Sequence, residues 1–233
     1  MKTRNRIILL LALALTCMIT SCESYLDTMP DQRTELNSVR KVKDLLMSAY
    51  STASSIQMEE FMSDNRMDNG EKYGFPSNIL MQGYYWIAAA NQALQAIEEL
   101  GDPEEAQPYK GEALMCRAYG HFALAKIFCM AYGDDADTNL GIPYITAPET
   151  NVGVQYERGT LAETYAMIDK DIEEGLPLIS SEAYDIPLYH FNQNAAYAFA
   201  AQFNLFYNKF DKAIRYATEA IGEDPSSVLR NMG

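Results

Sequence analysis

The chain has 233 residues, of which 18 are basic and 32 acidic, so its formal net charge at pH 7 is −14. The first 21 residues hold three of the basic residues and none of the acidic ones, and the remainder therefore carries about −17. This charge argues against binding to nucleic acid, whose phosphates need a basic surface, and against electrostatic attachment to anionic lipid. The remaining length suffices for one large domain or two small ones.

The start of the chain has the pattern of a secretory signal peptide. Three basic residues within positions 2–6 precede an apolar run at 7–15. The run is too short to span a bilayer, which takes roughly 20 apolar residues. We therefore expect this segment to direct export.

A cysteine follows where a bacterial lipoprotein would have one. Ile19-Thr20-Ser21-Cys22 resembles a lipobox, in which cleavage before the cysteine lets its thiol and its new amino group carry acyl chains. We expect a lipoprotein signal peptide over 1–21, lipidation of Cys22 and a lipidated tether over 22–37. Several acyl chains would hold the membrane stably, since a single chain binds only marginally. The alternative is an ordinary signal peptide whose cysteines are incidental.

The first helix and the first long loop are predicted between residues 38 and 76. Apolar residues recur at three- and four-residue steps from Val39 to Ala53, which favours an amphipathic helix with Ser38 as its cap. Residues 55–76 lose this period and are rich in Asp, Asn and Gly. Long loops in compact domains are often functional, so this loop is a candidate for ligand binding.

Two further helices are predicted at 77–100 and 102–131. Ser77 would cap the first of them, and Gly101 would end it. Asp102 would cap the second, with proline at its first position, and Pro108 would delay its regular part by a turn. Small side chains along 102–131 would let neighbouring helices approach closely.

Two cysteines, Cys116 and Cys129, lie inside the helix predicted at 102–131. Thirteen residues of helix separate them by roughly 20 Å, whereas a disulfide needs α-carbons within about 7 Å. They cannot pair with each other, so we expect buried, inert thiols. The sequence has no Cys/His spacing typical of a zinc site.

The rest of the chain predicts a second long loop and three helices. The loop covers 133–159, and Thr160 and Glu163 then make a capping box for a fourth helix that closes near Gly175. Residues 192–225 resemble a tetratricopeptide unit, the helix-turn-helix repeat of about 34 residues. Because no segment shows strand alternation, we expect an all-α fold, a solenoid of tetratricopeptide-like helical pairs with long loops.

Taken together, these segments resemble the SusD/RagB family of surface lipoproteins from Gram-negative glycan-uptake systems. The segments that carry the likeness are Cys22-Glu23-Ser24-Tyr25-Leu26-Asp27, Tyr84-Tyr85 with Ile87 and Ala90-Asn91, Gly111-Glu112-Ala113 with Arg117-Ala118, Phe122 and Leu124, and Tyr132-Gly133 with Gly141-Ile142-Pro143-Tyr144. Family members are usually about twice this length. The resemblance therefore implies an amino-terminal portion or a truncated member, with one SusD-like helical domain over 38–233.

The resemblance implies a non-catalytic protein that captures oligo- or polysaccharide at the cell surface. Its partner would be a SusC-like, TonB-dependent transporter in the outer membrane, with the Cys22 anchor in outer-membrane lipid and the protein facing the cell exterior. An alternative is a helical scaffold that binds peptide or docks on the transporter without a complete glycan site. A surface hydrolase ranks last, because the sequence offers no triad, metal set or supported carboxylate pair.

The residues themselves also argue against catalysis, and no cofactor is predicted. Neither His121, expected in the core or on a helix surface, nor His190, expected in a loop, lies beside a nucleophile motif. The pairs of adjacent glutamates at 98–99, 104–105 and 173–174 are more typical of solvated helix faces than of a glycosidase. The acidic residues of 134–139 fail the EF-hand spacing, so we expect an ordinary acidic loop and no metal.

Candidate ligand-binding residues are polar and aromatic side chains of the first long loop. Sugars stack their apolar faces on aromatic rings, while amides and carboxylates bind the hydroxyl groups. The candidates are Asp64, Asn65, Tyr73 and Phe75. The aromatic run Tyr84-Tyr85-Trp86 follows in a helix, where we expect at least two of the three to pack in the core.

Overall fold

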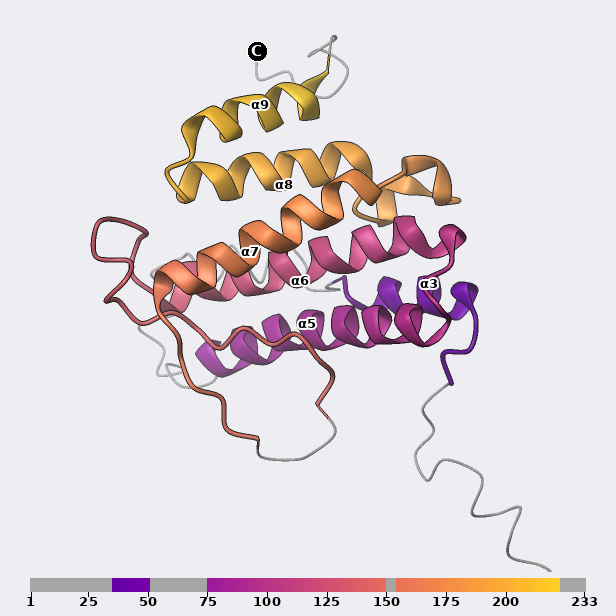
Figure 1. The fold of residues 1–233 in the computed structure, drawn as a ribbon, viewed down its shortest axis with the longest axis horizontal. Helices are drawn as coiled ribbons and strands as arrows, with labels where there is room; N and C mark the ends of the chain where they lie inside the picture. The colour runs from indigo at the N-terminus through magenta and orange to yellow at the C-terminus, as the bar shows by residue number, and fades with distance from the viewer. Residues whose placement is uncertain (1–34, 51–74, 150–153, 223–233) are drawn as a thin grey trace, which may run out of the picture. The chain divides into compact units, whose positions relative to one another are not determined.

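The computed structural model describes residues 35–50, 75–149 and 154–222, with side chains in the first long helix described from Gly83 onward. Its α-helices are α3 (Val39–Ser48), α5 (Phe75–Glu99), α6 (Gln107–Phe128), α7 (Leu161–Gly175), α8 (Gln193–Phe206) and α9 (Phe210–Ile221) (Figure 1). Short 3-10 helices cover Glu104–Ala106, Leu176–Leu178, Ser181–Ala183 and Pro187–Tyr189. Within these ranges the β-structure is one isolated bridge between Leu140 and Thr160, so the predicted all-α fold is confirmed. None of the described helices is both long and apolar enough to cross a membrane.

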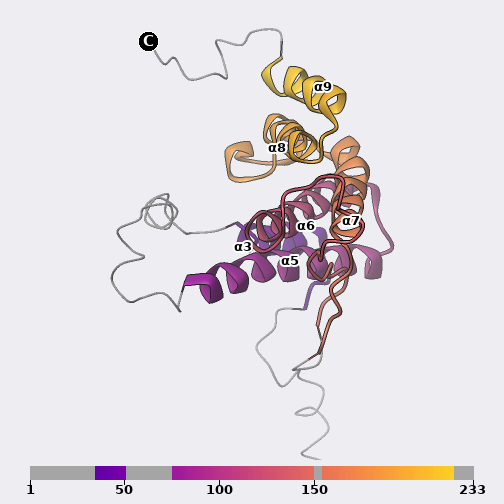
Figure 2. The same ribbon diagram turned by 90° about the vertical axis from the view of Figure 1, so that its left-hand side faces the viewer.

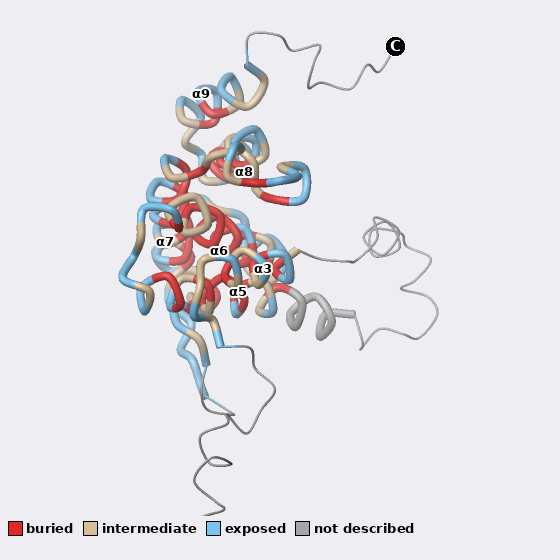
Figure 3. Tube along the Cα trace, turned by 90° about the vertical axis from the view of Figure 1, so that its right-hand side faces the viewer, coloured by how far each residue is buried: buried red, intermediate tan, exposed pale blue. Residues whose placement is uncertain are grey.

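Helix α6 is the centre of the helical domain. It packs against α5 and α7, α3 covers α5, and α8 and α9 form the next helical pair (Figures 1 and 2). Of its 22 residues 13 are buried, among them every residue from Gly111 to Ala118 (Figure 3). A helix that is buried on all sides has to find partners for its polar side chains inside the protein.

Two predicted helix ends are confirmed in detail. The Thr160 side chain accepts from the Glu163 N–H while the Glu163 carboxylate accepts from the Thr160 N–H, which completes the capping box of α7. At the end of α5, Gly101 has φ +86°, and Asp102 N–H donates to the Ile97 carbonyl at 2.9 Å. Glycine adopts this left-handed conformation without strain and so ends the helix.

Two predicted boundaries at the N-terminal side are wrong. Helix α5 begins at Phe75 and not after Ser77, because a proline such as Pro76 is tolerated in a first helical turn, where its missing N–H costs nothing. Phe75 is therefore a helix residue and not a loop residue. Helix α3 ends at Ser48, well before Ala53, which lies outside the described residues.

The boundaries of α6 also differ from the prediction. Asp102 has φ +53° and is not the cap; Pro103 takes that position before a 3-10 turn. As expected, regular helix is delayed and starts at Gln107. The helix ends at Phe128, which leaves Cys129 at its C-terminal cap and only partly buried.

Both described cysteines are free, as predicted. Cys116 is buried, and burial raises the pKa of its thiol well above the ordinary range. Cys129 departs from the predicted buried position, because the chain leaves the helix there.

Glycines let α6 approach its neighbours closely, as the small residues along it predicted. A Cβ on Gly111 would lie 2.8 Å from the Gly175 carbonyl oxygen, and one on Gly175 would lie 2.9 Å from the Gly111 carbonyl oxygen. Backbone atoms cannot move aside as the end of a side chain can. The α6–α7 contact therefore requires glycine on both helices.

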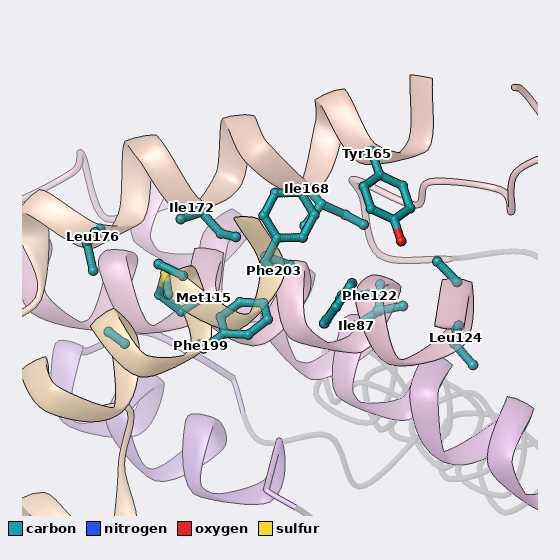
Figure 4. Close-up of a cluster of buried hydrophobic side chains, with 14 of the residues drawn as sticks. Ile87, Met115, Phe122, Leu124, Tyr165, Ile168, Ile172, Leu176, Phe199 and Phe203 are labelled. Carbon is teal, nitrogen blue, oxygen red and sulfur yellow. The ribbon is translucent and has the colours of Figure 1, made fainter. Parts of the chain in front are cut away.

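The largest part of the core fills the space between α6, α7 and α8. Ile168 and Ile172 of α7 face Met115 and Phe122 of α6, and Phe203 of α8 inserts beside them (Figure 4). Phe122 and Phe203 meet edge to face, with ring centroids 5.4 Å apart. Aromatic rings of this size contribute much of the apolar area that folding buries.

Candidate functional site

A buried ion pair joins α6 to α7. Arg117 donates from Nε and Nη2 to the two carboxylate oxygens of Asp171, both at 2.7 Å. Its Nη1 donates to the side chain of Asn91 on α5 at 3.1 Å. Burial works against the charge of Arg117, but the hydrogen bonds and charge of Asp171 outweigh it, so the pKa of the guanidinium is raised. Three helices are thereby tied together by one side chain.

The same cluster attaches the second long loop to the helices. The Tyr144 hydroxyl donates to Asp171 at 2.6 Å, and its ring stacks on His121 with centroids 3.7 Å apart. Asn91 donates to the carbonyl of Ile145 at 3.0 Å. These contacts define what we call the Arg117 cluster: Asn91, Arg117, His121, Tyr144 and Asp171.

The contacts of His121 identify its tautomer. The backbone N–H of Ile145 donates to Nε2 at 2.9 Å, so Nε2 carries no proton. Nδ1 lies 2.8 Å from the Arg117 carbonyl and must be the N–H donor. Burial lowers the pKa of His121 to about 3. Of the two predicted placements, core or helix surface, the structure shows the core. This imidazole is neutral and holds the loop.

A second buried cluster lies on another side of α6. Glu112 is fully buried, and its Oε1 accepts from the hydroxyl of Tyr50 and lies 2.8 Å from Nδ1 of His190. Tyr184 stacks on the His190 ring at 4.2 Å, and the Tyr50 hydroxyl accepts from the Phe191 N–H. His190, predicted in a loop, directly follows the 3-10 helix Pro187–Tyr189 and is buried. We call Tyr50, Glu112, Tyr184 and His190 the Glu112 cluster.

Aromatic side chains reach the surface beside this cluster. The rings of Trp86 and Tyr119 are 5.7 Å apart, and Tyr119 also contacts Phe191 at 6.0 Å. Tyr119 is 37 % exposed although its neighbours in α6 are buried. We call Trp86, Tyr119 and Phe191 the aromatic face. Such rings can stack on the apolar face of a sugar.

A hollow of about 570 Å³ lies between α5, α6 and residues 146–148. Leu94, Ile97 and Leu114 supply apolar walls, and polar side chains of α5 and α6 complete its lining. None of the residues of the aromatic face lines it. The hollow and the aromatic face are therefore two separate candidate sites.

The predicted ligand residues are only partly visible. Asp64, Asn65 and Tyr73, together with Cys22, lie outside the described residues, and Phe75 is the first residue of α5. Their proposed roles stay predictions.

The prediction that at least two members of the aromatic run in α5 pack in the core is wrong, because only Tyr84 packs against a core cluster. Tyr84 packs against the main core, Trp86 is half-buried against Tyr119, and Tyr85 is 55 % exposed. Tyr119 could not be predicted from the sequence, since only the fold brings it beside Trp86. The feature that marks Tyr119 is an exposed aromatic ring on a helix whose other residues are mostly buried.

The paired glutamates lie on exposed positions, as expected, with one addition. Glu173 accepts from Lys212 at 2.7 Å and from Tyr216 at 2.6 Å, so it also links α7 to α9.

Among the described residues, no group of three or more His, Cys, Asp or Glu side chains could hold a metal ion.

A family model described as "Starch-binding associating with outer membrane" matches residues 69–205, more than half of the chain. The chain belongs to this SusD-like family. The match covers α5 to α7 and nearly all of α8, and so includes both buried clusters except Tyr50. The resemblance first seen in short motifs is confirmed.

Individual SusD-like relatives agree with this assignment. The SusD-like protein P38 of Formosa agariphila is 24 % identical over 99 % of this chain and 48 % of its own length. A SusD superfamily structure from Bacteroides thetaiotaomicron is 26 % identical, with a TM-score of 0.56 over 65 % of this chain and 33 % of its own. A putative sugar-binding protein from Bacteroides vulgatus reaches a TM-score of 0.63 at 21 % identity, over 82 % of this chain and 47 % of its own. The matches thus cover between one third and one half of the length of these relatives.

The SusD-like motif residues that carried the resemblance have mainly structural roles. Arg117 and Asn91 form the centre of the Arg117 cluster, and Tyr144 attaches the loop to it. Gly141 lies against Thr160 and Thr164 so closely that a Cβ would not fit. These motif residues therefore stabilise the fold through buried contacts.

Proposed function

We propose that this protein is a non-catalytic, surface-exposed lipoprotein that binds oligo- or polysaccharide and delivers it to a SusC-like, TonB-dependent transporter. The observation that carries the proposal is the family match over residues 69–205, whose description names starch binding and the outer membrane. A structural relative with a TM-score of 0.53 at 18 % identity is named a laminarin-binding SusD-like protein, so laminarin belongs in a ligand panel beside starch.

The aromatic face is the described surface that best suits a sugar ring. Trp86 and Tyr119 come from two packed helices, so their relative position is fixed before a ligand arrives. Preorganised aromatic rings bind with little loss of side-chain entropy. The first long loop, with Tyr73, Asp64 and Asn65, directly precedes α5 in sequence and would add polar contacts.

Affinity electrophoresis of the chain from Glu23 onward, in gels containing starch, laminarin and other glucans, tests glycan binding. We expect retardation in at least one gel and its loss in Tyr119→Ala. Tyr189→Ala is the matched control, because Tyr189 is 61 % exposed and lies outside the aromatic face. Equal retardation of the two variants would refute the role of the aromatic face, and no retardation in any gel would refute glycan binding by this portion.

The lipid anchor has its own test. We expect the wild-type chain in the membrane fraction and Cys22→Ala in the soluble fraction, with labelled palmitate incorporated only into the former. Membrane retention of the variant would contradict the anchor.

A docking role on the transporter is the second candidate, and one surface feature favours it. Ile186, Leu188 and Tyr189 are 51 %, 86 % and 61 % exposed around a single 3-10 turn. Exposed apolar residues in one patch are typical of protein–protein contacts. Leu188→Ser should weaken co-purification with the transporter without changing glycan retardation; unchanged co-purification would contradict this role.

A further inference from the structure

The hollow has a charge pattern that the proposed glycan binding does not explain. Four charged side chains line it: Glu98, Asp102, Lys110 and Arg117. Lys110 pairs with Asp102 at 2.7 Å, and Arg117 pairs with Asp171 at 2.7 Å.

Glu98 is the exception among these four. Within the residues that the structure describes, the Glu98 carboxylate has neither an ion pair nor a hydrogen bond. Its side chain is exposed beside the opening of the hollow. The four charged side chains of the lining, counted together with Asp171, are three carboxylates and two cations. One negative charge therefore remains uncompensated.

The position of Glu98 in its helix adds to this negative potential. Glu98 and Glu99 are the last two residues of α5, and the last turn contains no basic residue. The C-terminal end of a helix carries a partial negative charge that favours cations and disfavours carboxylates. A cation bound beside Glu98 would relieve both effects.

The walls of the hollow indicate what would carry this cation. Leu94, Ile97 and Leu114 give it an aliphatic side, and Asn91 and Glu98 are seven residues apart along α5, about 10 Å. An extended alkyl chain of four or five carbons is shorter than this distance, so it can lie along the aliphatic side and place an ammonium group at Glu98. A bare metal ion would leave the aliphatic walls without a contact.

We propose that the hollow binds an alkylammonium group, with its apolar stem along the aliphatic walls and its ammonium at Glu98. A lysine side chain of a peptide and a free polyamine share this chemistry. Glu98 would form a charge-assisted hydrogen bond with the ammonium group, while Lys110 and Arg117 keep their own partners. The inference goes beyond the proposed glycan binding, and its test contains no glycan, so either can fail without the other.

The test is isothermal titration of the chain from Glu23 onward at low ionic strength. The probes are the end-blocked tripeptide Ala-Lys-Ala, the same tripeptide with norleucine in place of lysine, and cadaverine. We expect the norleucine peptide to bind at least about five-fold more weakly than the lysine peptide, because it lacks the charged donor. Binding of cadaverine without the lysine peptide would support the ammonium site and identify a free polyamine as the ligand source.

Two matched variants test the position of the site. Glu98→Gln should weaken binding of the cationic probe by about five-fold or more, since it removes the charge and keeps the shape. Glu99→Gln removes the same charge from the next residue, which does not line the hollow, and should leave the affinity nearly unchanged. Equal losses in both variants would mean non-specific attraction to an acidic chain and would overturn the proposal. Equal affinity for the norleucine peptide and the lysine peptide would also overturn the proposal. The absence of binding by both the lysine peptide and cadaverine would overturn it as well.

Discussion

The Arg117 cluster and the Glu112 cluster both attach an irregular segment to α6, but they satisfy their buried carboxylates differently. Both oxygens of Asp171 accept hydrogen bonds, from Arg117 and from Tyr144. In Glu112, Oε1 accepts from Tyr50 and lies 2.8 Å from Nδ1 of His190, while Oε2 is buried without a hydrogen-bond partner.

This difference indicates which of the two buried carboxylates contributes more to the stability of the fold. Every donor nitrogen and acceptor oxygen of the buried Arg117–Asp171 ion pair is used. Removing one partner leaves the other charge buried and uncompensated, which strongly destabilises the fold. A buried carboxylate with one oxygen that accepts no hydrogen bond is already incompletely stabilised in the folded protein. Its replacement should therefore cost less free energy of unfolding. We therefore expect unequal effects from matched substitutions in the two clusters.

The largest effect is expected from Asp171→Asn. The amide nitrogen has to face a donor of Arg117 or Tyr144, and Arg117 is left buried without a counter-charge. We expect the free energy of unfolding to fall by about 3–5 kcal/mol, measured by urea denaturation. Lys110→Met, which breaks the exposed pair with Asp102, is the control and should have little effect. A loss for Asp171→Asn as small as the control would show that the cluster does not stabilise the fold.

The second effect is a pH dependence of the Arg117 cluster, which contains His121. The pKa of His121 is about 3 in the folded protein, below the ordinary value near 6.5, so between these values the unfolded chain binds a proton that the native state does not. Stability conferred by the neutral imidazole is complete above pH 6.5 and is lost as the pH falls towards 3, at up to about 1.4 kcal/mol per pH unit.

His121→Gln removes this titration and keeps a neutral polar side chain. We expect the variant to be less stable than the wild type at pH 7, but to lose stability less steeply between pH 6.5 and 4, as followed by urea denaturation at a series of pH values. Parallel curves for the two proteins would show that His121 takes up protons equally in the folded and unfolded states, which would contradict a pKa lowered by burial.

A smaller effect is expected from Tyr144→Phe. The substitution removes one hydrogen bond to Asp171 and keeps the ring that stacks on His121. Since Arg117 still binds both carboxylate oxygens, we expect a loss of about 1–1.5 kcal/mol in urea denaturation. A loss as large as that of Asp171→Asn would mean that Tyr144, and not Arg117, is the essential partner.

The smallest effect is expected from Glu112→Gln. The amide oxygen can keep the two contacts of Oε1, and the amide nitrogen takes the place of the unpartnered Oε2. We expect the free energy of unfolding to change by about 1 kcal/mol or less. A loss equal to that of Asp171→Asn would abolish the contrast between the clusters and indicate that the charge of Glu112 is required.

The sequence determined the helical class and the ends that depend on local chemistry. The Thr160–Glu163 capping box and the stop at Gly101 each use residues within one turn of each other. Boundaries that depend on more distant contacts were wrong. Helix α3 stops early, for example, where Tyr50 reaches Glu112, 62 residues away in the chain.

The candidate sites depend on contacts between residues that are distant in the sequence. Trp86 and Tyr119 lie 33 positions apart and form one face only because α5 and α6 pack together. Glu98 looked like any solvated glutamate until the fold placed it on the rim of a hollow where the other charges are paired. Sequence spacing determines contacts made within a helical turn, whereas close packing determines which distant side chains meet, are buried or stay unpartnered.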